Sequence, residues 1–400
     1  MKQAQLFYFV VQLRFFMKKA YPILLSLAIA LIGCTEDNSP TKATQKENGN
    51  EKEPVAVDYS AGRAMNKRLG KGINLGNSWD SQSWGKLDGG WGNPIEDNDF
   101  KIIKEAGFNS VRLPVRWNED SDYETHTVNP DRLKGVKEDI QLAIDQGLAV
   151  VVNFHHYTTL NNLGGGAFRG KTDSIALFEA EKAHFLSLWD QVSKELNKFP
   201  DSLVVLEILN EPTIPGADIV NDIMLSAYEV IRKNAPKKTI MFESYHAAKF
   251  ADLGDLELPE DGNIIYSGHY YEPYNFSHEG HGDEACVGDA AYNNTAAGDL
   301  KSYVALAQKL YPDVNGGSVP MNMGEFGVSG GKGTQSSCNR NGTPTSDAKK
   351  ALWAKKSVQA AESFDMSWHY WGFTKVGGFE AYDRNNNKWY PGFPEVFFSK

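Results

Sequence analysis

Two glutamates follow apolar segments at positions where an enzyme would place catalytic carboxylates. Glu211 lies in the tripeptide Asn-Glu-Pro after the segment 203–209, and Glu325 lies in Gly-Glu-Phe-Gly after the segment 319–323. An ionisable group at the end of an apolar strand is unfavourable unless it is paired or takes part in chemistry. Two facing carboxyl groups, one protonated and one ionised, can cleave a glycosidic bond. For either glutamate alone, the alternative is a solvated loop residue or an ion-pair partner.

Other polar and aromatic residues end the apolar segments as well. They are Arg112, His155 and His156, Asn210, His269 and Tyr271, and Trp371. The carboxyl ends of the strands of a parallel barrel meet at one rim, so we expect these side chains to gather with the two glutamates. Together with the ending that carries Glu325, six strand endings in chain order favour a shared site. A purely structural role would leave these endings unexplained.

Short apolar runs alternate with amphipathic stretches from residue 72 onward. The predicted strands are 72–77, 110–115, 149–156, 203–212, 239–244, 263–271, 319–327 and 366–373, and the predicted helices lie near 95–106, 130–147, 174–197, 218–235, 297–310 and 346–362. This alternation predicts an α/β fold, a (β/α)8 TIM barrel forming a single catalytic domain over 55–400. The alternative, a doubly wound open sheet, lacks support because no G-x-G-x-x-G follows the first strand.

Composition and charge narrow the class of protein. The chain has 400 residues, of which 41% are hydrophobic and 23% charged, which excludes wholesale disorder. The formal net charge of −10 gives no attraction to phosphate backbones, so we expect no nucleic-acid partner. The 9 Trp and 17 Tyr offer flat faces for a neutral, ring-shaped ligand, although a large aromatic core is the alternative.

Residues 1–34 predict an export signal that ends in a lipidation site. Lys18 and Lys19 precede an apolar run at 21–32, and Cys34 follows in a Leu-Ile-Gly-Cys sequence similar to the bacterial lipobox. We therefore expect lipid on Cys34, with an ordinary cleaved signal as the alternative. Met17, Lys18 and Lys19 would themselves make a conventional signal start, so residues 1–16 are interpreted as an upstream extension.

The segment 35–54 is polar and predicts a disordered linker that tethers the domain to a membrane through the lipid. The expected location is the bacterial cell envelope, at the outer membrane or surface, with secretion as the alternative. In such a compartment a disulfide between Cys286 and Cys338 can persist, and two free thiols are the other possibility. A metal site built from His278, His281 and Cys286 is a weaker interpretation of the same region.

Seven segments taken together resemble glycoside hydrolase family 5, the cellulase family built on the (β/α)8 barrel, and within it the endoglucanases. The resemblance covers roughly residues 60–395, through Gly-Ile-Asn-Leu-Gly-Asn at 72–77, Val-Arg-Leu-Pro-Val at 111–115, Asn-Phe-His-His at 153–156, Leu-Asn-Glu-Pro at 209–212, Gly-His-Tyr-Tyr at 268–271, Gly-Glu-Phe-Gly at 324–327 and Ser-Trp-His-Tyr-Trp at 367–371. Each segment is short, and their order and spacing make the resemblance specific.

The resemblance implies a role for each residue. Glu211 would be the general acid/base and Glu325 the nucleophile of a retaining double displacement. Asn210 would bind the sugar 2-hydroxyl, and Arg112 and Tyr271 would hold Glu325 and keep its pKa low. His155 and His269 would orient the acid/base and the sugar, with His156 as a structural neighbour, and Trp371 would lie under the sugar ring. Trp79 and Trp117 are weaker candidates for binding platforms. Neither a metal nor an organic cofactor is implied.

The expected partner is a polysaccharide, and the expected activity is that of an endo-β-1,4-glucanase acting as a monomer. The opening at 72–77 and the segment Tyr-Glu-Pro-Tyr-Asn-Phe at 271–276 are most similar to the endoglucanase branches. The same mechanism on xyloglucan, mixed-linkage glucan, mannan or β-1,3-glucan is the alternative, because loops rather than fold decide the substrate. The alternative of another class is a surface glycan-binding lipoprotein without turnover, and it predicts a substitution at Glu211 or Glu325 that is not found.

Overall fold

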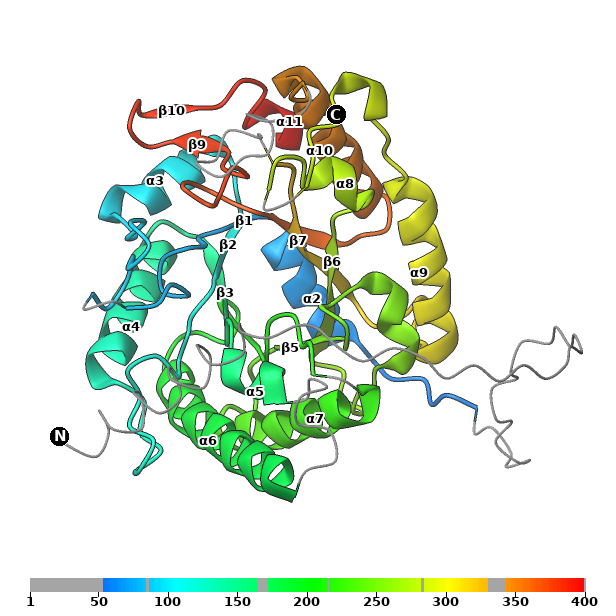
Figure 1. The fold of residues 1–400 in the computed structure, drawn as a ribbon. Helices are drawn as coiled ribbons and strands as arrows, with labels where there is room; N and C mark the ends of the chain where they lie inside the picture. Colours follow the sequence, from blue (N-terminus) through cyan, green and yellow to red (C-terminus); the bar gives the residue numbers. More distant parts are fainter. Residues whose placement is uncertain are drawn as a thin grey trace, which may run out of the picture. The chain divides into compact units, whose positions relative to one another are not determined.

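All eight predicted strands are present and pair in chain order into a closed parallel barrel (Figure 1). The strands are β1 (Lys71–Asn74), β2 (Ser110–Leu113), β3 (Ala149–Asn153), β4 (Val204–Glu207), β5 (Ile240–Glu243), β6 (Ile264–Tyr270), β7 (Met321–Phe326) and β8 (Ser367–Tyr370). The computed structural model describes residues 53–83, 86–163, 172–214, 216–281, 284–329 and 343–398. The predicted (β/α)8 barrel is therefore confirmed.

Helices surround the barrel, and the six predicted helices are present among them. They are α3 (Asp97–Ala106), α4 (Pro130–Asp145), α6 (Thr172–Leu196), α7 (Ala217–Asn234), α9 (Ala296–Leu310) and α10 (Asp347–Glu362). Several further elements were not predicted, namely α2 (Ser60–Leu69), α5 (Thr158–Leu163), η1 (Phe250–Asp255), α8 (Tyr274–Ser277), η2 (Asp289–Ala291) and the strand pair β9 (Tyr382–Asp383) and β10 (Lys388–Trp389). A short helix, α11 (Glu395–Phe398), follows this strand pair.

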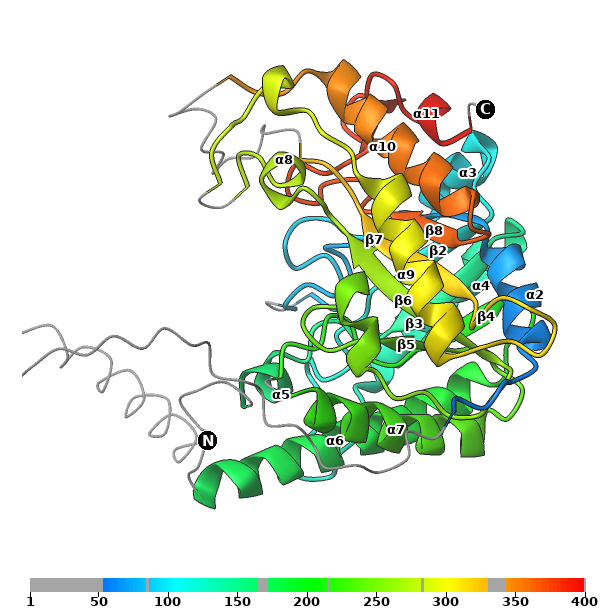
Figure 2. The ribbon, with the colours of Figure 1, turned by 90° about the vertical axis from the view of Figure 1, so that its right-hand side faces the viewer.

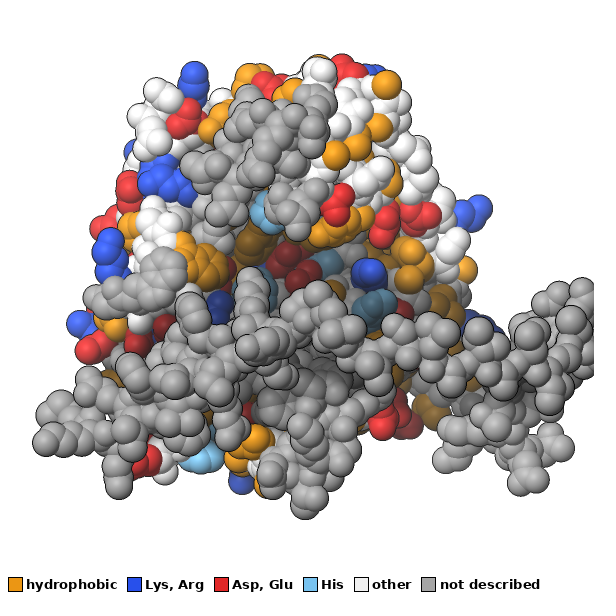
Figure 3. Space-filling model, viewed as in Figure 1, with side chains coloured by type: hydrophobic (Ala, Val, Ile, Leu, Met, Phe, Trp, Pro, Cys, Tyr) orange, Lys and Arg blue, Asp and Glu red, His pale blue; other side chains and the backbone are white. Residues whose placement is uncertain are grey.

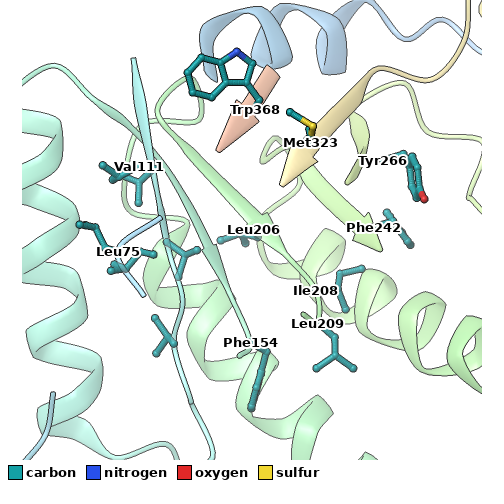
Figure 4. Close-up of a cluster of buried hydrophobic side chains, with 14 of the residues drawn as sticks. Leu75, Val111, Phe154, Leu206, Ile208, Leu209, Phe242, Tyr266, Met323 and Trp368 are labelled. Carbon is teal, nitrogen blue, oxygen red and sulfur yellow. The ribbon is translucent and has the colours of Figure 1, made fainter. Parts of the chain in front are cut away.

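Alternate residues of each strand face the helices and form the main hydrophobic core. Val111, Leu206, Phe242 and Tyr266 belong to this layer and are fully buried (Figure 4). Because successive side chains of a strand point to opposite faces, the residues between them must point into the barrel. The chemistry of the barrel interior is therefore set by the other half of each strand.

Helix α2 closes the amino-terminal end of the barrel, away from the loops that follow the strands (Figure 2). Its Met65 and Leu69 form a second buried cluster with inward-facing side chains of the strands, which are Ala149, Val151, Val205, Met241 and Ile265. Two residues further along β4 and β5, the inward positions are Glu207 and Glu243. The barrel thus has an apolar base and, above it, a charged layer.

Several strands end earlier than predicted, and this affects how the site is built. Strand β3 ends at Asn153 and β4 ends at Glu207, so His155, His156 and Glu211 lie in the turns that follow the strands. The chain leaves the ladder at these points, which lets consecutive side chains point into the same opening. Among the described residues, no helix is both long and apolar enough to cross a membrane.

The predictions for the amino-terminal region stay predictions. The export signal, Cys34 and the linker up to residue 52 lie outside the described residues, as does Cys338.

Candidate active site

A cavity of about 250 Å³ opens at the carboxyl ends of the strands. It is lined by Asn77, His155, His156, Glu211, Tyr271, His278, His281, Glu325, Trp371, Val376, Gly377 and Phe379. In the view of Figure 3, acidic and histidine side chains are visible in a hollow at the centre of this face. The structure therefore brings both predicted glutamates into one opening.

Glu325 extends from β7 and is held at both carboxylate oxygens. Nη1 of Arg112 donates to Oε1 at 2.7 Å, and the hydroxyl of Tyr271 donates to Oε2 at 3.0 Å. The Glu325 side chain is only 6% exposed, so it has little freedom to rotate away from these partners. The carboxylate is fixed in direction with one edge toward the cavity.

Glu211 follows β4 and is more open to solvent, with its side chain 30% exposed. Its Oε1 lies 2.8 Å from Nδ1 of His269, and its backbone N–H donates to Oε2 of Glu243 at 2.6 Å. The residue has a φ of 45°, in the left-handed region that residues other than glycine seldom adopt. Surrounding contacts must hold this conformation, and the Glu243 contact is one of them.

The two glutamates are close to each other. One carboxylate oxygen of Glu211, one of Glu325 and a ring nitrogen of His269 all lie within 4.8 Å of one another. A water or a sugar oxygen placed between the carboxylates would contact both. The same donor set could in principle hold a cation, but the guanidinium of Arg112 already compensates the negative charge of Glu325 at 2.7 Å.

Arg112 lies beneath the two glutamates and connects most of the charged groups. It is fully buried, and its Nε and Nη2 donate to Glu207 at 2.7 and 3.0 Å. Nη2 also donates to Asn210 at 2.6 Å, and Nη1 to Asn74 at 2.9 Å. Burial by itself would lower the pKa of Arg112, but Glu207 and Glu325 beside it raise the pKa above its usual value. Arg112 therefore stays charged.

Burial and the neighbouring cations act in opposite directions on the carboxyl groups. Burial raises the pKa of Glu325 above its usual value, and His269 and Arg112 only partly counteract that shift, so the expectation of a low pKa is wrong. Burial acts in the same direction on Glu211, but the hydrogen bond and the positive charge of His269 outweigh it and lower the pKa of Glu211. His269 itself is desolvated, yet Glu325 and Glu243 raise its pKa well above the usual value. In the free site the proton nearest to Glu211 thus lies on His269.

The two adjacent histidines are neutral at neutral pH. Burial lowers the pKa of His155 well below its usual value and that of His156 to about 4. Nδ1 of His156 lies 3.5 Å from Nδ2 of Asn210. Both rings line the cavity, so they are available to contact a sugar as neutral hydrogen-bonding groups.

Trp371 lies beside the cavity with its ring parallel to that of His155, at a centroid distance of 5.7 Å and an interplanar angle of 1°. A Cβ atom on Gly76 would lie 2.4 Å from Cη2 of this ring, so only glycine allows the indole to lie there. The glycine in the segment 72–77 is therefore explained by the ring that it accommodates.

Six of the predicted site residues line the cavity, and three others lie behind them. Arg112, Asn210 and His269 do not line the cavity but contact the residues that do. Asn210 is fully buried and accepts from Arg112. Its binding of a sugar hydroxyl remains a prediction.

Two predicted site residues are not in the site. Trp79 is 5% exposed and donates from its indole nitrogen to Asp139 at 2.6 Å. Trp117 is fully buried and donates to the carbonyl oxygen of Asn153 at 2.9 Å. The prediction that these two rings form binding platforms is wrong, because both pack in the core with their N–H groups satisfied by the protein.

This correction leads to a prediction about stability. Trp117→Ala should lower the free energy of unfolding by about 3–5 kcal/mol, since a fully buried indole is removed and leaves a cavity. Well below the unfolding temperature, KM for a soluble substrate should stay near the wild-type value. Trp371→Ala should behave in the opposite way, with a small change in denaturant midpoint and a large loss of kcat/KM. A Trp117→Ala protein that is as stable as wild type but binds substrate poorly would contradict the assignment.

Residues that support the site from within the barrel were not predicted from the sequence. Asn74 is buried, accepts from Arg112, and donates to the carbonyl oxygens of Gly324 and His369. Glu207 and Glu243 are fully buried acids inside β4 and β5. A single acidic residue within an otherwise apolar strand was the signal for each of these two.

Residues from the β6–α9 connection form one wall of the cavity, and His278 and His281, considered above only as metal-site candidates, are among them. The ring of His278 stacks on Tyr274 at 3.9 Å and packs at an angle to Tyr271 and Phe379. Glu279 is fully buried and fixes this connection by accepting from the backbone N–H and hydroxyl of Thr345 at 2.7 and 2.8 Å.

The cysteine predictions have different outcomes. Cys286 is disulfide-bonded, and its predicted partner Cys338 lies outside the described residues. A disulfide sulfur is not the thiolate that binds metal, so the interpretation of His278, His281 and Cys286 as a metal site is wrong.

Comparison with known proteins decides the family. The family model for cellulase, glycosyl hydrolase family 5, matches residues 70–376, which includes both glutamates and all eight strands. The chain belongs to glycosyl hydrolase family 5. The family is one of glycoside hydrolases, so the protein is a glycoside hydrolase, and the resemblance inferred from the seven segments is confirmed.

Several characterised relatives within family 5 are similar to this chain. It is 26% identical to Endoglucanase A of Clostridium longisporum over 84% of this chain and 66% of that protein. It is 31% identical to Cellodextrinase A of Ruminococcus flavefaciens over 52% of this chain and 60% of that protein. The chain thus spans less than two thirds of the length of these relatives.

Solved structures give the same picture. A structure of Thermotoga maritima Cel5A in complex with cellobiose has a TM-score of 0.68 and 28% identity, and it matches 84% of this chain and 99% of its own. A second structure of the Thermotoga protein, in complex with mannotriose, matches equally well. The Thermotoga protein has thus been crystallised with both cellobiose and mannotriose.

Proposed function

We propose that this protein is a retaining endo-β-1,4-glucanase that cleaves β-glucan chains by double displacement. The observation that carries the proposal is the proximity of Glu211 and Glu325, with carboxylate oxygens within 4.8 Å. Retaining enzymes place their two carboxyl groups about 5–5.5 Å apart, whereas inverting enzymes need about 6.5–9.5 Å to admit a water. The short separation favours the retaining course.

In the first step, Glu325 attacks the anomeric carbon while Glu211 protonates the departing oxygen. Arg112 and Tyr271 hold one oxygen each of Glu325, so its attacking edge keeps one direction and loses no freedom on binding. As the sugar replaces water at the partly exposed Glu211, the ionised carboxylate becomes less favourable. The proton on Nδ1 of His269, 2.8 Å away, can then move to Glu211.

In the second step, Glu211 accepts a proton from water, and that water attacks the glycosyl–Glu325 ester. The sugar is released with a new hydroxyl group as Glu325 becomes a carboxylate again, so protons balance over the cycle. Trp371 supplies an apolar face under the ring, where the oxocarbenium-like transition state flattens. Every step is assigned to side chains of the chain itself.

Endoglucanase is the proposed activity because three relatives that match 80% or more of this chain carry that name. The rings of His278 and Phe379, which line the cavity, suit a flat, unbranched chain. Mannan is the second candidate, since one of the similar Thermotoga maritima Cel5A structures is a complex with a mannotriose substrate. Export and lipid anchoring at Cys34 belong to the same proposal, because a polymer cannot enter the cell to meet its enzyme.

The experiment is a product-release screen on the chain from residue 55 onward, with Glu325→Gln as the blank. Carboxymethyl cellulose, mixed-linkage β-glucan, xyloglucan, mannan and β-1,3-glucan are offered separately. Release from the β-1,4-glucans supports the proposal, and release chiefly from mannan or β-1,3-glucan keeps the mechanism but changes the substrate. No release from any of the five would support the glycan-binding alternative.

A further inference from the structure

Glu243 is a fully buried carboxyl group that lies directly behind the acid/base and is not used by the mechanism above. It is the last residue of β5 and points into the barrel beside Glu207 of β4. Its Oε2 accepts from the backbone N–H of Glu211 at 2.6 Å, and its Oε1 lies 3.1 Å from Nε2 of His269. The two oxygens of one side chain thus contact both members of the Glu211–His269 pair.

The contact with the backbone of Glu211 constrains a conformation that is unfavourable by itself. Glu211 has a φ of 45°, and the loop after β5 continues with positive φ at His246, Ala247 and Ala248. This loop is hydrogen-bonded to the segments that carry Glu211 and His269. The N–H of Ala247 donates to the carbonyl oxygen of Pro212, and the N–H of His269 donates to that of Ala248. Left-handed residues persist only where surrounding contacts determine them. Glu243 supplies a side-chain contact to the backbone N–H of Glu211.

The contact with His269 determines which ring nitrogens carry protons. Nδ1 of His269 is 2.8 Å from Glu211 and Nε2 is 3.1 Å from Glu243, so a ring protonated at both nitrogens has a carboxyl oxygen on each side. The groups that face Glu243 are Arg112 from β2, Glu207 from β4 and His269 from β6. Burial raises the pKa of Glu243 well above its usual value. The positive charge of His269 lowers this pKa, and the negative charge of Glu207 raises it further.

The count of charges agrees with a proton held in this layer. Four carboxyl groups, those of Glu207, Glu211, Glu243 and Glu325, share two cations, Arg112 and His269. A protonated Glu243 can donate to Glu207 while its Oε2 accepts from the backbone N–H of Glu211. Such an arrangement leaves no like charges in direct contact.

We propose that Glu243 is a positioning residue for the acid/base Glu211. Glu243 holds the backbone of Glu211 and keeps His269 protonated at Nε2, the ring nitrogen that faces Glu243. This inference rests on the proposed function for its effect on catalysis, but not for its effect on His269. Glu243 touches no substrate, since it does not line the cavity.

The variant Glu243→Gln breaks this arrangement at one defined point. Oε2 of Glu243 accepts from the backbone N–H of Glu211, and Oε1 faces both Nε2 of His269 and Nη2 of Arg112, whereas glutamine has only one oxygen. Its amide nitrogen must therefore face either the N–H of Glu211 or Nε2 of His269. In the first case Glu211 loses its backbone anchor, and in the second His269 gives up the proton on Nε2. Glu325 keeps its contacts with Arg112 and Tyr271 in both cases.

The test compares Glu243→Gln with Asp139→Asn, a control that removes a partly buried carboxyl group outside the site. Asp139 lies on α4, accepts from Trp79, and has a pKa raised by burial to about 7. Two rates are measured, kcat/KM on a β-1,4-glucan oligosaccharide and on an aryl β-glycoside with an activated leaving group. The titration of His269 is followed by NMR of the imidazole nitrogens, assigned with a His269→Asn protein.

For Glu243→Gln, the rate on the oligosaccharide should fall by about 100-fold while the aryl glycoside is far less affected, since a misplaced acid matters only where protonation is needed. The His269 resonances should titrate at lower pH than in wild type. Asp139→Asn should change neither readout. Equal losses on both substrates together with an unchanged His269 titration would overturn the proposal.

Two further outcomes separate this inference from the proposed function. If the wild-type protein cleaves no glycan but His269 shifts in Glu243→Gln, the proposed function fails and the role of Glu243 stands. If Glu243→Gln does not fold, the wild-type spectrum decides. His269 protonated at both nitrogens through neutral pH supports the proposal, and a neutral ring with a single proton contradicts it.

Discussion

Glu325→Gln should lose turnover of β-glucan by on the order of 10⁵-fold while the fold is retained, because the covalent route is closed when the nucleophile is removed. The amide is the same size as the carboxylate but carries no charge to attack the anomeric carbon. Arg112 keeps its two contacts with Glu207, so the buried guanidinium is not left without a partner. The measurement is kcat on a soluble β-1,4-glucan, with the denaturant midpoint measured in parallel.

Substrate binding separates this loss from a collapse of the site. Glu325→Gln should still bind a cello-oligosaccharide in calorimetry, since Trp371, His155 and His156 line the cavity independently of Glu325. The matched comparison is Glu207→Gln, which changes a buried acid next to Arg112 but outside the cavity. Near-normal turnover by Glu325→Gln, with no trace of wild-type contamination, would overturn the nucleophile assignment.

Glu211→Ala should lose activity on β-glucan by about 10²–10⁴-fold, the usual contribution of a general acid/base. The loss should be much smaller for an aryl glycoside with an activated leaving group, since such a group departs without protonation. In that case the second step becomes limiting, because no base activates the water. Azide, which needs no base, should then restore turnover and yield a glycosyl azide with retained configuration.

The two substrates must be measured on the same protein preparation over the same pH range. For wild type, the loss of activity as pH rises should follow deprotonation of the coupled Glu211–His269 pair, since His269 carries the proton beside Glu211 in the free site. In Glu211→Ala this limb should disappear for the activated substrate. If both substrates are impaired equally and azide has no effect, Glu211 is not the acid/base.

The features that depend on local sequence were predicted correctly. Each strand is a short apolar run bounded by polar residues, so its position follows from hydrophobic pattern alone. Glu211 and Glu325 stand directly after such runs, and a barrel places all strand ends on one rim. The eight strands, their order and the meeting of the two glutamates thus follow from the amino-acid sequence.

Whether a tryptophan lies in the site or in the core depended on tertiary packing. Trp79 and Trp117 lie in loops after the first two strands, as an aromatic platform would, and the sequence offers no sign that distinguishes them from Trp371. In the fold, Asp139 on α4 and the carbonyl of Asn153 satisfy their N–H groups, and the rings become part of the core. Whether a loop aromatic faces a ligand or the interior is decided by residues distant in sequence.

The charged layer inside the barrel also depended on tertiary structure. Glu207 and Glu243 are 36 residues apart in sequence numbering, and each alone is an acid in an apolar strand. Closure of the barrel brings both against Arg112 and places Glu243 behind Glu211 and His269. A buried charge is tolerated only beside its partners, and those partners come from four different strands or strand ends. The sequence by itself determined which two glutamates meet at the rim and are proposed for the chemistry, and the closed barrel decided which residues surround and hold them.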